Sequence, residues 1–283
     1  MHLPPRIVPV LTGGGTRLPA HVGVLTALAE MGIHYDHLVG VSGGSVVASL
    51  VAAGKTPEHL QDMFRSVDFA QFRGHSLVNL MLRGGLSTGR RFERWLDGEL
   101  AGLRFADLNL DLHVVATDVR SGHPVTFNRQ TSPDLRVARA VLYSISIPLV
   151  FPFHHHGEYI LVDGGILAED SLFRDWAGDH TPVVCFRIRD KQAANHHALR
   201  RVLPIVDYLF MLVRTFVTTI SREYLSEHLW LSTLLIETEG FSPLEFHMTL
   251  GQKNALFELG YRTTLEYLPI KLGRIQGIQD SSR

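Results

Sequence analysis

The sequence predicts an α/β fold, a three-layer α/β/α sandwich with a mainly parallel central sheet. Two observations predict it: short apolar runs alternate with segments of helical periodicity, and glycine-rich loops join the first strands to the helices that follow. A strand, a helix and a second strand in succession form a βαβ unit with parallel strands. The 283 residues are 45% hydrophobic and 19% charged, which suits a sizeable core. We expect a single domain over 1–283, with its core at about 6–190 and an extension at about 191–275.

The first unit runs from a strand into a glycine loop and a helix. Residues 6–12 form the expected strand, in which Pro9 indicates an edge position or a strand end. After the loop, apolar side chains recur at helical spacing over 22–31, and Gly32 is a good helix stop. These elements therefore predict the opening strand and helix of the sheet.

The loop of this unit reads Gly13-Gly14-Gly15-Thr16-Arg17. Such a loop presents backbone N–H groups either to a phosphate or to an oxyanion. It matches neither G-x-x-x-x-G-K-[ST] nor G-x-G-x-x-G, which disfavours a nucleotide. Arg17 is expected to brace the loop or offer positive charge; an ordinary surface arginine is the alternative.

The second strand ends in a serine turn. It leads into Gly40-Val41-Ser42-Gly43-Gly44, and a small-residue helix follows over 46–53. A G-x-S-x-G pattern between a strand and a helix is typical of a nucleophile at a sharp turn. The glycines allow the tight bend, and the helix N-terminus favours an anion near the Ser42 hydroxyl. The same short pattern also occurs in plain connecting turns.

The middle of the chain is helical first and then richer in strands. Met, Phe and Leu side chains over 58–105 indicate either an ordinary core face or the lining of an acyl-chain pocket. Further elements are expected as strands at 110–117, 124–128, 150–153 and 159–162, with a helix at 134–145. The histidines at 154–156 alternate faces in a strand and are therefore not natural metal co-ligands.

Asp163-Gly164-Gly165 follows the strand at 159–162 directly. The two glycines let the carboxylate lie close to another loop, although an ordinary Asp-Gly turn has the same sequence. Later elements are expected as a strand at 182–189, a long helix at 200–224, a strand at 231–238 and a closing helix at 249–268. The apolar segment 205–213 indicates either a membrane-contacting surface or packing on the sheet or in a homodimer.

Composition narrows the class of protein. The net charge of −1 and the pI of about 7.0 argue against a general nucleic-acid binder. The single cysteine, Cys185, cannot form an internal disulfide. No secretory signal and no run of about 18 apolar residues is evident, so we expect a cytoplasmic protein.

The glycine loop, the Ser42 turn and Asp163-Gly164-Gly165, in that order, resemble the patatin-like phospholipases. The similarity extends from about Val8 to about Gly165, and Leu18 departs from it, since the family usually has glycine there. The resemblance implies a Ser–Asp dyad without histidine, Ser42 being the nucleophile and Asp163 the base. It also implies an oxyanion hole formed by Gly14, Gly15 and Thr16. The supporting positions are Gly13, Arg17, Gly40, Gly43, Gly44, Gly164 and Gly165.

The activity that the resemblance implies is hydrolysis of acyl esters of lipids, as in a phospholipase A or a lysophospholipase. The substrate would be a phospholipid or another acyl lipid, reached by transient contact with a membrane, and no cofactor or metal is expected. A Ser-His-Asp triad with a late histidine, His228 or His247, is one alternative. It is disfavoured because Ser42 follows only the second strand, whereas α/β-hydrolases place more strands before the nucleophile. A non-catalytic lipid-binding protein on the same fold is the other alternative.

Overall fold

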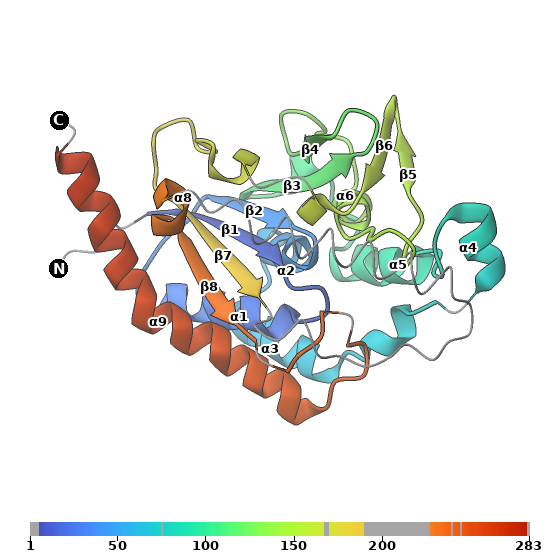
Figure 1. The fold of residues 1–283 in the computed structure, drawn as a ribbon, viewed down its shortest axis with the longest axis horizontal. Helices are drawn as coiled ribbons and strands as arrows, with labels where there is room; N and C mark the ends of the chain where they lie inside the picture. The colour runs from blue at the N-terminus through green and yellow to red at the C-terminus, as the bar shows by residue number, and fades with distance from the viewer. Residues whose placement is uncertain are drawn as a thin grey trace.

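The computed structural model describes residues 6–74, 76–166, 170–189, 227–238, 240–243 and 245–281. Its strands form one sheet in the order β5-β6-β3-β2-β1-β7-β8, with β4 paired to β3 (Figure 1). The parallel strands are β1 (Val8–Gly13), β2 (His37–Val41), β3 (Asp111–Asp118), β7 (Val183–Arg189) and β8 (Thr233–Glu237). The antiparallel strands are β4 (His123–Phe127), β5 (His154–His156) and β6 (Tyr159–Val162). The mainly parallel sheet expected from the sequence is confirmed.

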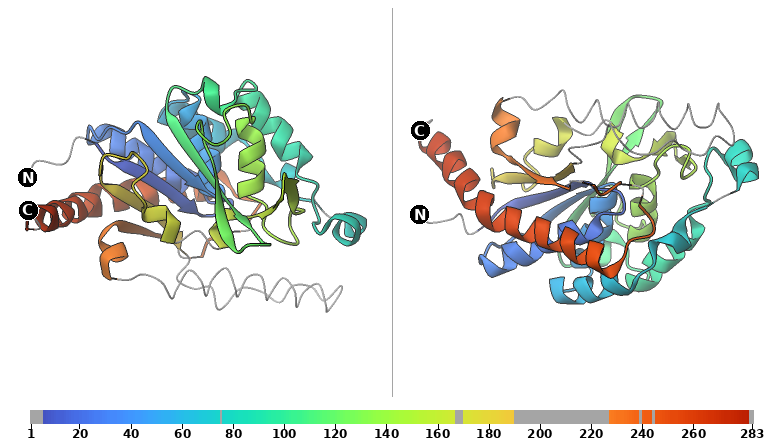
Figure 2. Two further views of the ribbon diagram at one scale, coloured as in Figure 1. Left: turned by 90° about the horizontal axis from the view of Figure 1, so that it is seen from above. Right: turned by 60° about the horizontal axis from the view of Figure 1, so that its bottom comes forward.

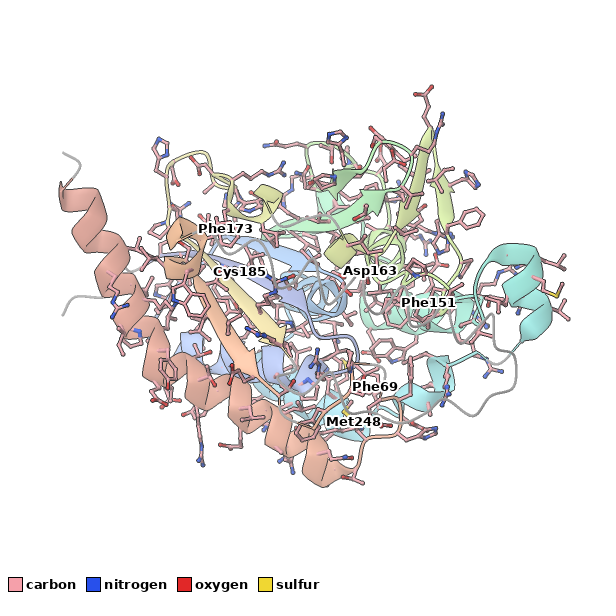
Figure 3. The ribbon with its side chains drawn as sticks, viewed as in Figure 1. Phe69, Phe151, Asp163, Phe173, Cys185 and Met248 are labelled. Carbon is pink, nitrogen blue, oxygen red and sulfur yellow. The ribbon has the colours of Figure 1, made fainter. Side chains whose placement is uncertain are left out.

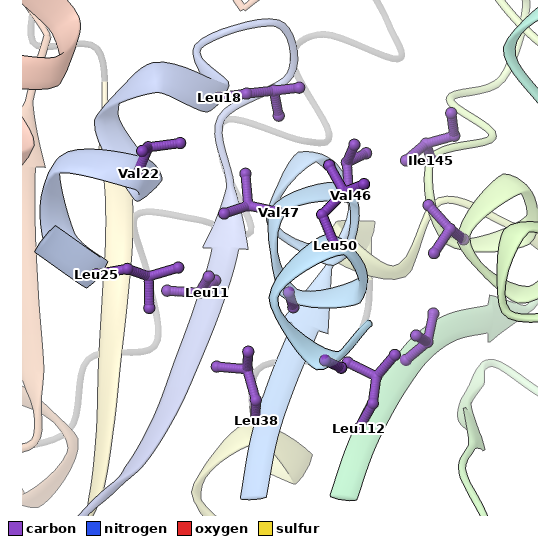
Figure 4. Close-up of a cluster of buried hydrophobic side chains, with 14 of the residues drawn as sticks. Leu11, Leu18, Val22, Leu25, Leu38, Val46, Val47, Leu50, Leu112 and Ile145 are labelled. Carbon is purple, nitrogen blue, oxygen red and sulfur yellow. The ribbon is translucent and has the colours of Figure 1, made fainter. Parts of the chain in front are cut away.

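The central strands are buried on both faces, which explains their continuous apolar sequences. On one face Leu11, Leu38 and Leu112 point from β1, β2 and β3 toward the helices (Figure 4). On the other face Leu172 and Trp176 pack with five valines of the same strands: Val8, Val10, Val39, Val41 and Val115. Because side chains alternate along each strand, the two clusters share the same three strands.

Helices α1 (Leu18–Glu30) and α2 (Gly43–Ala52) connect the first three strands and cover one face of the sheet. The long helix α9 (Leu250–Ser281) runs along the outside of α1 (Figures 1 and 2). The two helices approach closely because Gly260 carries no side chain: a Cβ there would lie 1.9 Å from the Ala20 carbonyl oxygen. The first and last helices of the chain therefore pack as a pair.

The segment between β2 and β3 holds helices α3 (Pro57–Ser66), α4 (Leu77–Arg83) and α5 (Arg90–Glu99). Helix α6 (Val137–Ser144) and the short helix α8 (Glu227–Leu231) complete the set used below. Of the apolar side chains on α3 and α5, four are buried in the main core: Leu60, Phe64, Phe92 and Leu96. Met63 and Trp95 are partly buried and pack against that core. The core interpretation of these positions is therefore confirmed. On α4, in contrast, Met81 and Leu82 are exposed.

Pro9 does not mark an edge strand, because β1 pairs with both β2 and β7. The N–H groups of Ile7 and Val8 point to opposite neighbours, so the Pro9 nitrogen faces the β2 side. Pairing with β2 begins only at Val10, so the missing N–H removes no ladder bond within that pairing.

Two further expected elements have different boundaries in the structure, and one expected segment lies outside the described residues. The strand expected at 150–153 instead lies at the histidines, as β5 (His154–His156). Helix α9 begins at Leu250 and continues to Ser281, beyond the expected end at 268. The apolar segment 205–213 lies outside the described residues. In the part of the chain that the structure describes, no helix is both long and apolar enough to cross a bilayer.

Candidate active site

Ser42 occupies a strained turn between β2 and α2. Its φ of 52° lies in the left-handed region, which non-glycine residues rarely adopt. The turn fits only because its glycines lack side chains: a Cβ on Gly44 would lie 2.1 Å from the Leu11 carbonyl oxygen, and one on Gly40 would lie 2.4 Å from Ser45 Cα. The sequence thus folds here into the sharp strand-to-helix turn that exposes a nucleophile above the sheet.

Asp163 follows β6 and lies beside this turn, near the end of α2 (Figure 3). The Ser42 hydroxyl donates a hydrogen bond of 2.6 Å to Asp163 Oδ2. The other carboxylate oxygen, Oδ1, accepts the Gly165 N–H at 2.8 Å. Gly164 is required where it is, because a Cβ there would lie 2.0 Å from the Val115 carbonyl oxygen. Both members of the pair are 5% exposed.

Burial raises the pKa of the Asp163 carboxyl to about 6, since water no longer solvates its charge, and the hydrogen bonds from Ser42 and Gly165 only partly offset this. A carboxylate with a pKa near neutrality is a stronger base than an ordinary aspartate and is still ionised at pH 7. The pair therefore has the proton acceptor that a serine nucleophile needs.

Two serines at the end of α6 hold the pair in place. Ser144 Oγ accepts the Ser42 backbone N–H at 2.9 Å and donates to the Val115 carbonyl oxygen at 2.6 Å. The Ser146 carbonyl oxygen accepts the Asp163 N–H at 2.9 Å. The sequence interpretation assigned neither residue to the site. The sequence shows only that two serines lie near the end of a helix, shortly before Pro148. That pattern does not indicate that Ser144 contacts a residue about a hundred positions away.

The glycine loop lies directly against the Ser42 turn. Gly13, Gly14 and Gly15 all have positive φ, at 70°, 99° and 54°. A Cβ on Gly43 would lie 2.5 Å from the Gly15 carbonyl oxygen and 3.1 Å from its nitrogen. The glycine loop and the Ser42 turn therefore meet backbone to backbone.

Thr16 differs from its expected role. Its N–H donates to the Pro243 carbonyl oxygen at 2.9 Å, and its hydroxyl donates to the Glu245 carbonyl oxygen at 2.8 Å. The segment between β8 and α9 therefore takes up the donor that the sequence interpretation assigned to the oxyanion hole. To stabilise an oxyanion, the Thr16 N–H must first release Pro243.

Arg17 is buried, with 4% of its surface exposed, and is not a surface arginine. Its guanidinium donates to the Gly14 carbonyl oxygen at 3.0 Å and to Thr238 Oγ1 at 2.7 Å. It thereby ties the glycine loop to the end of β8. His21 lies under the same loop, where burial lowers the pKa of its imidazole to about 4 and keeps it neutral.

Among the described residues, Ser42 Oγ has Asp163 as its hydrogen-bond partner and no histidine. His247 has an exposed side chain in the segment before α9, and the side chain of His228 lies outside the described set. The described residues also contain no group of three potential metal ligands. A base, a nucleophile and a loop of backbone donors in one buried site suit acyl transfer through a serine.

The sequence matches the family profile described as Patatin-like phospholipase over residues 10–171. The uncharacterized protein YqhO of Bacillus subtilis is 26% identical, the match covering 92% of this chain and 97% of YqhO. The uncharacterized NTE family protein Rv2565 of Mycobacterium tuberculosis is 30% identical, over 64% of this chain and 30% of that protein. The chain therefore spans less than one third of the mycobacterial relative.

Two solved structures have the same fold over nearly all of this chain. VipD from Legionella pneumophila superposes with a TM-score of 0.69 at 16% identity, over 95% of this chain and 67% of VipD. A chain of the ExoU–SpcU complex from the type III secretion system of Pseudomonas aeruginosa superposes with a TM-score of 0.57 at 21% identity, over 96% of this chain and 52% of that chain. At these identities the likeness concerns the fold, and it supports the α/β architecture described above.

Proposed function

Because the chain belongs to the patatin-like phospholipase family, a family of lipid acyl hydrolases, we propose that Ser42 and Asp163 catalyse its hydrolysis of acyl esters in phospholipids or lysophospholipids. The observation that carries the proposal is the 2.6 Å hydrogen bond between the Ser42 hydroxyl and the buried Asp163 carboxylate. The whole of 1–283 acts as one patatin-like domain in this proposal.

In the acylation half of the reaction, a new bond from Ser42 Oγ to the acyl carbon replaces the C–O bond to the lipid alcohol, and Asp163 transfers one proton. Asp163 takes the hydroxyl proton while Ser42 Oγ attacks the ester carbonyl carbon. The negative charge on the carbonyl oxygen is stabilised by backbone N–H groups, for which Gly14 and Gly15 are the candidates. When the C–O bond to the lipid alcohol breaks, Asp163 returns the proton to the leaving oxygen, and an acyl-serine remains.

Deacylation repeats these steps with water. Asp163 removes a proton from a water molecule, the hydroxide attacks the acyl-serine, and the fatty acid leaves as Ser42 recovers its proton. Backbone donors of the glycine loop supply the electrostatic stabilisation in both halves, so the proposal needs no metal ion. Losing one such donor raises the barrier by about 3 kcal/mol in other serine hydrolases.

The test compares wild type with Ser42→Ala and Asp163→Asn on short-chain esters and phospholipids in the presence of EDTA. Each substitution is expected to lower kcat by on the order of 10⁴. A fluorophosphonate probe should label wild type and fail to label Ser42→Ala. His228→Ala and His247→Ala are the controls, and we expect both to keep activity.

Two results would overturn the proposal. Loss of activity in either histidine variant with its fold intact would indicate a triad. A folded wild type that neither labels nor hydrolyses any of the lipids would leave lipid binding without turnover as the function of this fold.

A further inference from the structure

Helix α4 presents an apolar face to solvent. Val78, Met81 and Leu82 are 65%, 87% and 78% exposed. Their i, i+3, i+4 spacing places them on one side of the helix. Five of the seven residues of α4 are apolar. A helix of a globular protein normally turns its apolar side chains inward, so the exposure of these three is an exception to that pattern.

Phe153 extends this surface. It is 48% exposed, and a Cβ on Gly84, at the end of α4, would lie 3.3 Å from its ring. The ring of Phe153 therefore lies against the end of α4, and we call Val78, Met81, Leu82 and Phe153 the α4 patch. In Figure 1, α4 projects from the body of the molecule, away from α9.

The sequence around the α4 patch is cationic. Arg73, Arg83, Arg90 and Arg91 lie between Asp68 and Glu93, and that interval contains no Asp or Glu. All four arginines are exposed, and none forms an ion pair with another described residue. Exposed apolar side chains with arginines nearby are complementary to the apolar interior and anionic headgroups of a bilayer.

The patch is connected to the candidate active site by one short segment. The N–H groups of Leu86 and Ser87, just after α4, donate to the carbonyl oxygens of Leu149 and Val150 at 2.9 Å each. That partner segment leads back within a few residues to Ser146, whose carbonyl oxygen holds the Asp163 N–H, and to Ser144. The segment that follows α4 is therefore hydrogen-bonded to the stretch of chain that leads to Ser144 and Ser146.

We propose that the α4 patch is the docking surface of this protein for an anionic lipid bilayer, with its apolar side chains inserted at the interface and the arginines on the headgroups. The proposal rests on the proposed lipid hydrolase function, since it names where the protein meets its substrate. It differs from the sequence interpretation, which assigned membrane contact to 205–213.

The test measures binding of the full chain to vesicles by co-sedimentation, in a Ser42→Ala background so that no lipid is consumed. Phosphatidylcholine vesicles with and without phosphatidylglycerol are compared. Met81→Ser with Leu82→Ser is expected to weaken binding to the mixed vesicles at least about tenfold. Arg73→Gln with Arg83→Gln should lower binding to mixed vesicles about fivefold per charge and leave binding to pure phosphatidylcholine unchanged.

Ile270→Ser is the control, because Ile270 is an apolar side chain, 50% exposed, on α9 and outside the α4 patch. It should bind vesicles like its parent. With Ser42 restored, the α4 variant should hydrolyse a soluble short-chain ester at the wild-type rate and lose activity only on vesicles.

Vesicle binding that survives the α4 substitutions, or that is absent from the parent, would overturn the docking proposal. A change of oligomeric state in the α4 variant without loss of vesicle binding would overturn it as well, since the patch would then join two copies of the chain. Failure of the hydrolase proposal is a separate result, because the binding assay uses an inactive protein and soluble ester hydrolysis does not involve the bilayer.

Discussion

Ser144 fixes the backbone of the nucleophile turn without touching the reacting atoms. Its hydroxyl is fully buried and joins the Ser42 N–H to the Val115 carbonyl oxygen. Ser144→Ala leaves both groups without this partner. We expect kcat to fall about 10- to 100-fold, since an unpaired buried polar group costs about 1–3 kcal/mol, with little change in KM.

Ser49→Ala is the control for this effect. Ser49 is also fully buried, but its hydroxyl bonds only to the Val46 carbonyl oxygen within α2. Steady-state kinetics and thermal unfolding of both variants separate positioning from stability. Equal losses of kcat in the two variants would contradict a positioning role for Ser144.

The pKa of Asp163 sets the expected pH dependence of the reaction. Proton transfer from Ser42 requires the ionised carboxylate, whose pKa is raised to about 6 by burial. The kcat/KM of the wild type should therefore rise about tenfold per pH unit below this value and reach a plateau above it. The profile is measured with a soluble ester from about pH 5 to about pH 8, roughly one unit below this pKa to roughly two units above it. A kcat/KM that stays flat over this range would exclude Asp163 as the base.

The same shift predicts an effect on stability. Folding raises the pKa of Asp163 from 3.8 to about 6, so the native state favours the protonated form. Its stabilising contribution is complete below pH 3.8 and is lost as the pH rises through 6. At pH 7 the buried charge costs about 3 kcal/mol. Asp163→Asn should therefore gain stability relative to wild type as the pH rises through this window, as urea titrations would measure.

Local sequence was enough to indicate Ser42 and Asp163, because each is set by glycines within two residues of it. It was not enough for the contacts that complete the site. Ser144 lies 102 residues from Ser42, and Pro243 lies 227 residues from Thr16. Those contacts depend on how whole elements pack, which no local pattern records. The sequence interpretation assigned the Thr16 N–H to the oxyanion hole because the local pattern does not show that Pro243 accepts this N–H.

At the scale of elements, the contact between α1 and α9 depends on Gly260. A side chain there would meet the Ala20 carbonyl oxygen within 1.9 Å, and backbone cannot yield as a flexible side chain can. Gly260→Val should force the helices apart and destabilise the protein by about 1–3 kcal/mol or more. Chemical denaturation measures the change.

Gly251→Ala is the contrasting substitution on the same helix. A Cβ at Gly251 would meet only Thr249 Oγ1, at 3.9 Å. Alanine is the better helix former, so this variant should be more stable than wild type by roughly 0.5–1 kcal/mol. If the two glycine variants behave alike, close packing is not the reason that Gly260 is needed.

Elements with clear periodicity were predicted close to their true positions, and the errors fall where tertiary context decides. The strand predicted at 182–189 is β7, which starts one residue later, and the strand predicted at 110–117 is β3, shifted by one residue. Of the two positions that Pro9 indicated, the edge position is wrong because β1 pairs on both sides, whereas the strand end is confirmed because Pro9 is the second residue of β1. The exposure of Met81 and Leu82 on α4 was not predicted either, because a helix that is apolar on most sides does not indicate which side is buried.

At the scale of the whole molecule, the candidate site exists only when distant parts of the chain are assembled. Its loop follows β1, its nucleophile follows β2 and its base follows β6, while β8 and the segment before α9 hold the loop through Arg17 and Thr16. We therefore expect the C-terminal region to unfold together with the core. This is the physical argument for one domain over 1–283.

The three tryptophans test that argument, because each reports on a different region. Trp95 packs on Phe72 beside the inserted helices, and Trp176 packs at a tilt against His113 on the opposite sheet face. Trp230 lies under Lys271 of α9. Variants that keep one tryptophan and replace the other two with phenylalanine should unfold in urea with coincident fluorescence midpoints, as a cooperative domain requires. Because the substitutions can lower stability, the fluorescence midpoint of each variant is compared with the urea midpoint of the same variant measured by far-ultraviolet circular dichroism. A separate, earlier transition at Trp230 would instead show that the C-terminal region unfolds alone, and residues 1–283 would then contain two cooperative units.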